Sequence, residues 1–119
     1  MKKVFYLKTC STCKRIMSDL DLEGWTLREL KTENVTATEL EAMHQLAGSY
    51  EALFSKRSTQ IKAQGIEVSQ LTEADYKKLI LEHYSFLKRP VFLTEKTIFI
   101  GNSSKTVEAV KAYFDDQKV

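Results

Sequence analysis

The chain's two cysteines lie three positions apart, in Cys10-Ser11-Thr12-Cys13, between two segments of different periodicity. The segment before them, Lys3 to Leu7, is a short run of aromatic and β-branched residues that predicts a strand buried on both faces. The segment after them, Ser11 to Glu23, has apolar side chains at helical spacing. We therefore expect the cysteines at a turn that leaves a strand and begins a helix. This restricts the chain to folds that begin with a strand, a turn and a helix.

The next residues complete this unit. Gly24 is placed to end the helix, and the alternation of apolar and polar residues from Trp25 to Arg28 predicts a second strand. Because a strand–helix–strand crossover within one sheet is right-handed, its two strands are parallel. The first thirty residues thus predict a βαβ unit.

A helical insertion is predicted at about residues 34–85. Two of its helices begin with capping-box signatures, in which a threonine is followed three residues later by an acidic residue: Thr36 with Glu39, and Thr72 with Asp75. Gly48 is placed to end the first of these helices. The charged stretch from Tyr50 to Gly65 predicts a short helical or irregular connector between them.

The C-terminal part predicts two strands and a helix. The only proline, Pro90, opens the apolar run 91–93, and a second run follows at 98–100, so a hairpin is expected. Ser103 or Ser104 then caps a last helix. The order βαβ, helical insertion, ββα predicts an α/β fold with a small mixed four-stranded sheet and helices on its faces.

Composition limits the classes of protein to which the chain can belong. Its 119 residues, 43% hydrophobic and 29% charged, suffice for one domain with a core. Eighteen basic against sixteen acidic residues leave a net charge of +2, so we expect no direct nucleic-acid partner. The longest apolar run, 4–7, is far shorter than a membrane span, so we expect no membrane association. Two cysteines so close together point to a reducing compartment, and we expect a cytoplasmic protein.

The cysteine pair has a chemical logic at a helix N-terminus. Unpaired backbone N–H groups and the positive end of the helix dipole favour a thiolate there, and Lys8, Lys14 and Arg15 add positive charge. An ordinary thiol is roughly 3% ionised at pH 7, whereas a pKa about two units lower makes it mostly thiolate. We therefore expect Cys10 to be the nucleophile and Cys13, about one turn into the helix, to be the resolving thiol.

Two other interpretations of the pair stay open. The cysteines would be half of a zinc site if other ligands existed, but His44 and His83 lack the spacing of zinc ligands, and we expect no metal. Alternatively, they are two small buried side chains without reactivity.

Pro90 also allows two interpretations. It either marks the start of an edge strand or forms a cis peptide that turns the preceding backbone toward a neighbouring group. If the second holds and faces the cysteine turn, Arg89 brings a guanidinium to the thiolate or to a bound oxyanion, and Arg57 could do the same from the insertion. An isolated arginine is otherwise more often a solvated surface residue.

Four motifs together resemble a known family: the strand and turn at Cys10, Leu53-Phe54-Ser55-Lys56-Arg57-Ser58, Leu87-Lys88-Arg89-Pro90-Val91, and Ile98 to Gly101. Over residues 3–114 the chain is similar to the ArsC/Spx family of thioredoxin-like proteins. The resemblance implies a thioredoxin-like fold for a single domain, 1–119, with the insertion between its βαβ and ββα halves. It also implies a cis peptide before Pro90.

The resemblance further implies a site. In arsenate reductases of this family a cysteine matching Cys10 attacks arsenate, and arginines matching Arg57 and Arg89 bind the oxyanion and lower the thiol pKa. Guanidinium groups suit this task because they bind tetrahedral oxyanions in a bidentate manner. The expected substrate-binding residues are Lys8, Ser11, Thr12, Arg57, Arg89 and Pro90. No bound cofactor is expected; glutathione with glutaredoxin, or thioredoxin, would supply the electrons.

The sequence departs from the family pattern at three places. Gly101 and Asn102 stand where reductases that use glutathione have a third arginine, Lys8 replaces a proline, and Cys13 is more typical of Spx-type regulators. Two classes of function follow. The first is a thiol-dependent oxidoreductase acting on arsenate or on a glutathione-linked substrate. The alternative is a redox-sensing transcriptional regulator of the Spx type, which contacts RNA polymerase and uses a Cys10–Cys13 disulfide as its switch.

Overall fold

The computed structural model describes residues 1–117, and the chain divides into two compact units. The first consists of residues 1–33 together with residues 89–117, and the second of residues 34–88. The predicted insertion at about 34–85 falls within the second unit.

The first unit is built on a four-stranded mixed sheet, which confirms the prediction. Its strands are β1 (Lys2–Tyr6), β2 (Thr26–Glu29), β3 (Val91–Thr94) and β4 (Ile98–Ile100). They lie side by side in the order β2-β1-β3-β4. Strand β1 pairs in parallel with β2 and antiparallel with β3, and β3 forms a hairpin with β4. The central position of β1 means that the turn following it lies at the middle of one sheet edge.

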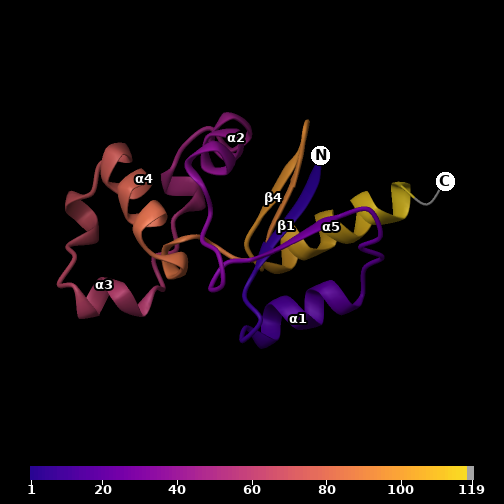
Figure 1. Ribbon diagram of the computed structural model, residues 1–119, viewed down its shortest axis with the longest axis horizontal. Coiled ribbons are helices and arrows are strands. Elements are labelled where there is room, and N and C mark those ends of the chain that lie inside the picture. Colours follow the sequence, from indigo (N-terminus) through magenta and orange to yellow (C-terminus); the bar gives the residue numbers. More distant parts are fainter. Residues whose placement is uncertain (118–119) are drawn as a thin grey trace. The chain divides into compact units, whose positions relative to one another are not determined.

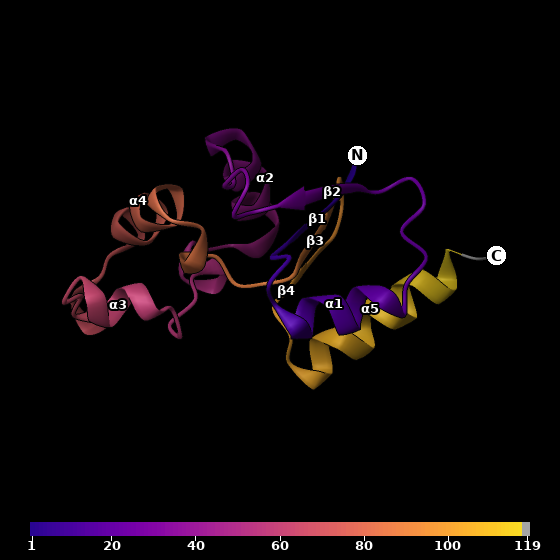
Figure 2. The same cartoon turned by 60° about the horizontal axis from the view of Figure 1, so that its bottom comes forward.

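One face of this sheet is covered by two helices, α1 (Ser11–Ser18) and α5 (Ser104–Asp116), which lie side by side in both ribbon views (Figures 1 and 2). Their buried side chains meet those of the sheet in one core cluster: Val4, Ile16, Phe92, Val110 and Phe114. Trp25 stacks on Phe114, with ring centroids 5.1 Å apart. This packing fixes the start of α1 against the end of β1.

Helix α1 is shorter than predicted, because it ends at Ser18 and not at Glu23. The Ser18 hydroxyl donates to the carbonyl of Arg15 (2.8 Å), so it competes with the backbone hydrogen bonds of a continuing helix. Gly24, with φ 83°, lies in the turn before β2 and does not end the helix. The prediction was wrong because Leu20 has the apolar spacing of a longer helix, although it packs against the core from outside the helix.

The second unit contains three α-helices and three short 3₁₀ turns. These are α2 (Ala37–Ala47), η1 (Glu51–Leu53), α3 (Thr59–Ala63), η2 (Val68–Gln70), α4 (Glu73–Glu82) and η3 (Tyr84–Phe86). Both predicted capping boxes are formed, at the starts of α2 and α4. Gly48 ends α2 with φ 89°, a left-handed conformation that suits glycine. Inside the unit Phe54 stacks on Phe86 and contacts Tyr76.

The capping box of α2 gives a test of this local structure. Thr36 accepts the N–H of Glu39 at 3.1 Å, and the Glu39 carboxylate accepts the N–H of Thr36 at 3.0 Å. Thr36→Ala removes one of these bonds and is expected to lower the free energy of unfolding by about 1 kcal/mol in a urea titration. Thr38→Ala, an exposed position inside the same helix, is the control. Equal stability of the two variants would contradict the capping role.

Candidate functional site

Cys10 lies at the N-cap of α1, at the end of the turn that leaves β1. Its N–H donates to the carbonyl of Leu7 (3.1 Å), and its sulfur accepts the N–H of Cys13 at 3.4 Å. The sulfur therefore takes the role that a serine or aspartate oxygen has at most helix starts. Both cysteines are free thiols; Cys10 is partly exposed and Cys13 is buried. The strand-to-helix turn predicted from the spacing is thus confirmed.

The two thiols differ in acidity. Partial burial acts to raise the pKa of Cys10, but hydrogen bonds from Cys13, the charge of Arg89 and a hydrogen bond from Thr12 outweigh it and lower that pKa below its usual range. For Cys13 burial dominates: with the nearby Cys10 sulfur it raises the pKa to about 12, against a hydrogen bond from Leu7 and the charge of Arg89. Cys10 is therefore the more acidic of the two thiols.

Strand pairing explains why Arg89 acts on both sulfurs. Strands β1 and β3 are antiparallel, with Phe5 paired to Val91. This pairing ends at Phe5 and Val91, so Arg89 lies two residues before β3 at the same edge of the sheet at which β1 leads into the cysteine turn. Residues more than seventy positions apart in the sequence thereby meet at one edge of the sheet.

The Arg89–Pro90 peptide is cis, which confirms the prediction. The two residues that follow β4 donate hydrogen bonds to its backbone. Gly101 donates its N–H to the Pro90 carbonyl (2.9 Å), and the Asn102 amide donates to the Arg89 carbonyl (3.4 Å). The two residues that stand in place of a third arginine thus bind the backbone of Arg89 and Pro90.

Three further predicted residues surround Cys10 in the sequence and in space. Lys8 and Ser11 are exposed, and Thr12 is half-buried with its backbone directed at the Cys10 sulfur. They lie in the turn and in the first turn of α1. Their contact with a substrate stays a prediction.

Arg57 belongs to the second unit. It is exposed and precedes Ser58, whose hydroxyl caps α3 and forms a 2.6 Å hydrogen bond with the hydroxyl of Ser85. The cap fixes the backbone directly after Arg57. The role of Arg57 as an anion ligand stays a prediction.

Glu29 is a residue that sequence reasoning missed. One oxygen of its carboxylate accepts the N–H of Lys8 at 2.7 Å, two residues before Cys10. The other accepts the N–H and the hydroxyl of Thr32, at 2.7 and 2.9 Å. An acidic residue at the end of a predicted strand gives no signal by itself. Only the pairing of Tyr6 with Glu29 across parallel strands could have pointed to it.

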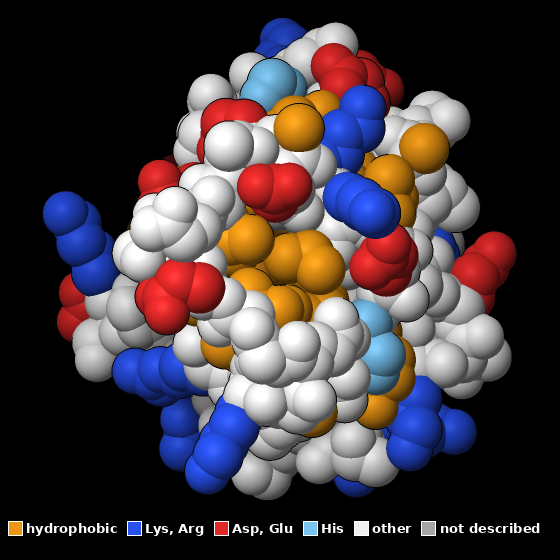
Figure 3. Space-filling model, turned by 90° about the vertical axis from the view of Figure 1, so that its left-hand side faces the viewer, with side chains coloured by type: hydrophobic (Ala, Val, Ile, Leu, Met, Phe, Trp, Pro, Cys, Tyr) orange, Lys and Arg blue, Asp and Glu red, His pale blue; other side chains and the backbone are white. Residues whose placement is uncertain are grey.

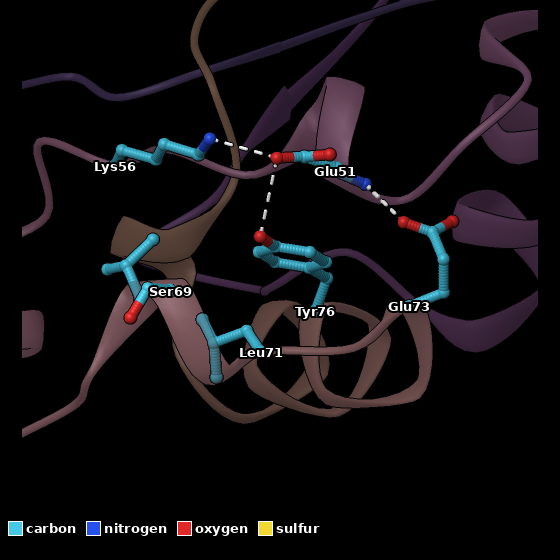
Figure 4. Close-up of a pocket in the computed structure, with 7 residues that line it drawn as sticks. Glu51, Lys56, Ser69, Leu71, Glu73 and Tyr76 are labelled. Carbon is cyan, nitrogen blue, oxygen red and sulfur yellow. Dashed lines mark hydrogen bonds and ion pairs between the residues drawn. The ribbon is translucent and has the colours of Figure 1, made fainter.

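The second unit has a hollow of its own. Figure 3 shows the face on which α3 and α4 lie, with hydrophobic side chains gathered in a depression among acidic and basic ones. A cavity of about 360 Å³ in this unit is lined by Glu51, Lys56, Val68, Ser69, Leu71, Glu73 and Tyr76 (Figure 4).

The charged groups of this cavity pair with their neighbours. Glu51 accepts from Lys56 at 2.9 Å and from the Tyr76 hydroxyl at 3.4 Å. Glu73 accepts the N–H groups of Tyr50 and Glu51, at 2.7 and 3.0 Å. These contacts fix the start of η1 against the start of α4, which is a structural task.

Two features are absent from residues 1–117. No cluster of three or more histidine, cysteine or acidic side chains in this part of the chain is placed to bind a metal ion. None of the helices described combines the length and the apolar character that crossing a membrane requires.

Comparisons with known proteins agree with this geometry. A model of the ArsC family matches residues 5–110. The Global transcriptional regulator Spx 2 of Bacillus anthracis is 26% identical over 111 residues, which cover 90% of this chain and 84% of that protein. The structure of an arsenate reductase from Vibrio cholerae is 16% identical, with a TM-score of 0.73 over 93% of this chain and 95% of its own. An arsenate reductase (ArsC) related protein from Brucella melitensis is 24% identical, with a TM-score of 0.66 over 91% and 92%. The predicted thioredoxin-like fold is confirmed by this likeness.

Proposed function

Because this chain belongs to the ArsC family, we propose that it is a thiol-dependent oxidoreductase in which Cys10 attacks the substrate and Cys13 resolves the intermediate. The observation that supports this most is the unequal acidity of two thiols within one helical turn. A nucleophile needs a thiolate at neutral pH, whereas a resolving thiol must not compete for the substrate. The lowered pKa of Cys10 and the raised pKa of Cys13 fit this division of roles.

Arsenate is the first substrate that we propose. The Cys10 thiolate attacks arsenic, a sulfur–arsenic bond forms, and one oxygen leaves as water after protonation. Cys13 then attacks the sulfur of Cys10, the sulfur–arsenic bond breaks, and its electron pair leaves with arsenic as arsenite. The two thiols lose two electrons and two protons, and arsenic(V) becomes arsenic(III). Glutathione with glutaredoxin, or thioredoxin, returns two electrons and two protons to the disulfide.

Substrate binding is proposed for the groups around the turn. Arg89, whose charge reaches Cys10, is one anion ligand, and Arg57 is the proposed second. The N–H groups at the start of α1, which Ser11 and Thr12 begin, and the charge of Lys8 add donors for an oxyanion. A disulfide between glutathione and a second thiol is the other substrate class, because attack on sulfur needs the same thiolate.

The test measures arsenite formation by wild-type protein and Cys10→Ser. Each is supplied with glutathione and glutaredoxin, and separately with thioredoxin and its reductase. We expect turnover with one donor system and none in the variant. Absence of turnover with both donors would overturn arsenate as the substrate. A mixed glutathione disulfide, supplied next, then decides between the two substrate classes.

A regulator of the Spx type is the second candidate function. It is favoured by the relative from Bacillus anthracis, which is named a transcriptional regulator, together with the Cys10–Cys13 pair. Purified bacterial RNA polymerase is passed over three immobilised samples: oxidised wild-type protein, reduced wild-type protein and the Cys13→Ser variant. Binding by the oxidised form alone would support the regulator. Equal retention in all three states, or none, would exclude the disulfide as its switch.

A further inference from the structure

The turn that presents Cys10 is attached to the sheet through one carboxylate. Glu29 is the last residue of β2 and pairs with Tyr6, the last residue of β1. Its Oε2 atom accepts the N–H of Lys8 at 2.7 Å. This hydrogen bond therefore binds the backbone of the cysteine turn directly beyond the end of the strand ladder.

The second oxygen of Glu29 binds another loop. Oε1 accepts the N–H and the hydroxyl of Thr32, in the segment through which the chain leaves the first unit. Partial burial acts to raise the pKa of Glu29, but the hydrogen bonds from Lys8, Thr32 and Lys31 outweigh it and lower that pKa. Glu29 is therefore ionised at neutral pH, and hydrogen bonds to an ionised acceptor are stronger than those between neutral groups.

Lys8 stands between the residues that fix the two sulfurs. On one side the carbonyl of Leu7 accepts the N–H of Cys10 at 3.1 Å, and the Leu7 backbone acts to lower the pKa of Cys13. On the other side of Lys8, two residues further along the chain, the sulfur of Cys10 accepts the N–H of Cys13. A change in the Lys8 backbone therefore alters the alignment of the Cys10 sulfur with its donors.

From these contacts we propose that Glu29 is a positioning residue for Cys10, which fixes the cysteine turn through the N–H of Lys8 and so keeps the Cys10 sulfur on its hydrogen-bond donors. The inference rests on the proposed function, because it concerns the nucleophile of that reaction. Its effect has a definite sign. If Glu29 acted through its negative charge, removing it would make Cys10 more acidic, whereas loss of a positioning contact makes Cys10 less acidic.

The experiment follows alkylation of each thiol by iodoacetamide between pH 5 and 10, with peptide mass spectrometry to separate Cys10 from Cys13. The variants are Glu29→Ala and Glu29→Gln, and Glu33→Gln is the matched control, since Glu33 pairs with Arg28. In Glu29→Ala we expect the midpoint for Cys10 to move to higher pH and its alkylation at pH 7 to slow about three- to tenfold. Glu29→Gln, whose amide oxygen can still accept from Lys8, is expected to lie between this variant and wild type.

The two thiols together separate positioning from stability. Loss of global stability would expose buried Cys13 and speed the alkylation of both cysteines, whereas loss of positioning slows Cys10 and leaves Cys13 slow. Faster exchange of the Lys8 amide hydrogen in Glu29→Ala is expected as well. Unchanged or faster alkylation of Cys10 would overturn the proposal. No substrate is used, so inactivity toward arsenate with slowed alkylation in Glu29→Ala would overturn the proposed function alone.

Discussion

Cys10→Ser is expected to remove the fast phase of thiol alkylation at pH 7 together with all reductase turnover, while Cys13→Ser retains the fast phase. The reason is the difference in acidity: the pKa of Cys10 is lowered, and burial with the nearby Cys10 sulfur raises the pKa of Cys13 to about 12. Alkylation consumes the thiolate, so a thiol with a pKa near 12 reacts at only about 10⁻⁵ of its full rate at pH 7. The alkylation rates of both variants are measured by quenching the reaction at set times and quantifying the labelled thiols.

The Cys13→Ser variant separates attack from resolution. It keeps the backbone N–H that donates to the Cys10 sulfur at 3.4 Å, so Cys10 stays reactive. After one cycle with a disulfide substrate, this variant should accumulate a mixed disulfide at Cys10, whereas wild type forms the Cys10–Cys13 bridge. Fast alkylation that survives in Cys10→Ser would assign the nucleophile to Cys13 and reverse the roles proposed above.

Local signals explain which parts of the fold could be predicted. The capping box of Thr36 and Glu39 involves residues three apart, so the sequence alone specifies it, and the start of α2 was predicted correctly. The position of Cys10 was predictable for the same reason, since the strand, the turn and the helix start follow one another in the chain. The prediction of where α1 ends was wrong, because Leu20 continues the apolar spacing although the helix has already ended at Ser18.

The site depends on pairings that no local pattern contains. The approach of Arg89 to Cys10 requires the antiparallel register of β1 and β3, and from the sequence it could be inferred only through a family resemblance. The contact of Glu29 with the cysteine turn depends on the parallel register of β1 and β2. Its partner is the backbone N–H of residue 8, which every residue type except proline has, so the identity of that residue gives no signal. The departure from proline to Lys8 thus has a second consequence beyond charge, because it supplies the N–H that Glu29 binds.

Arg89→Met is expected to slow alkylation of Cys10 at pH 7, by at most about tenfold for a rise of about one unit in the thiol pKa. The sign follows from the contacts, since the charge of Arg89 lowers the pKa of Cys10 and no longer does so in the variant. The midpoint of the pH–rate curve should move up, and the rates of variant and wild type should converge above it. Lys88→Met, which removes an adjacent exposed charge, is the control.

Arg89→Lys distinguishes charge from geometry in the same measurement. It keeps a positive charge but lacks the planar fork that binds an oxyanion through two hydrogen bonds. We therefore expect its alkylation rate to lie near that of wild type, while protection of Cys10 by added arsenate is weakened as strongly as in Arg89→Met. Protection that is unchanged in both variants would show that Arg89 is not an anion ligand. Because alkylation and protection are read on one thiol, a role in thiolate stabilisation and a role in substrate binding can each fail separately.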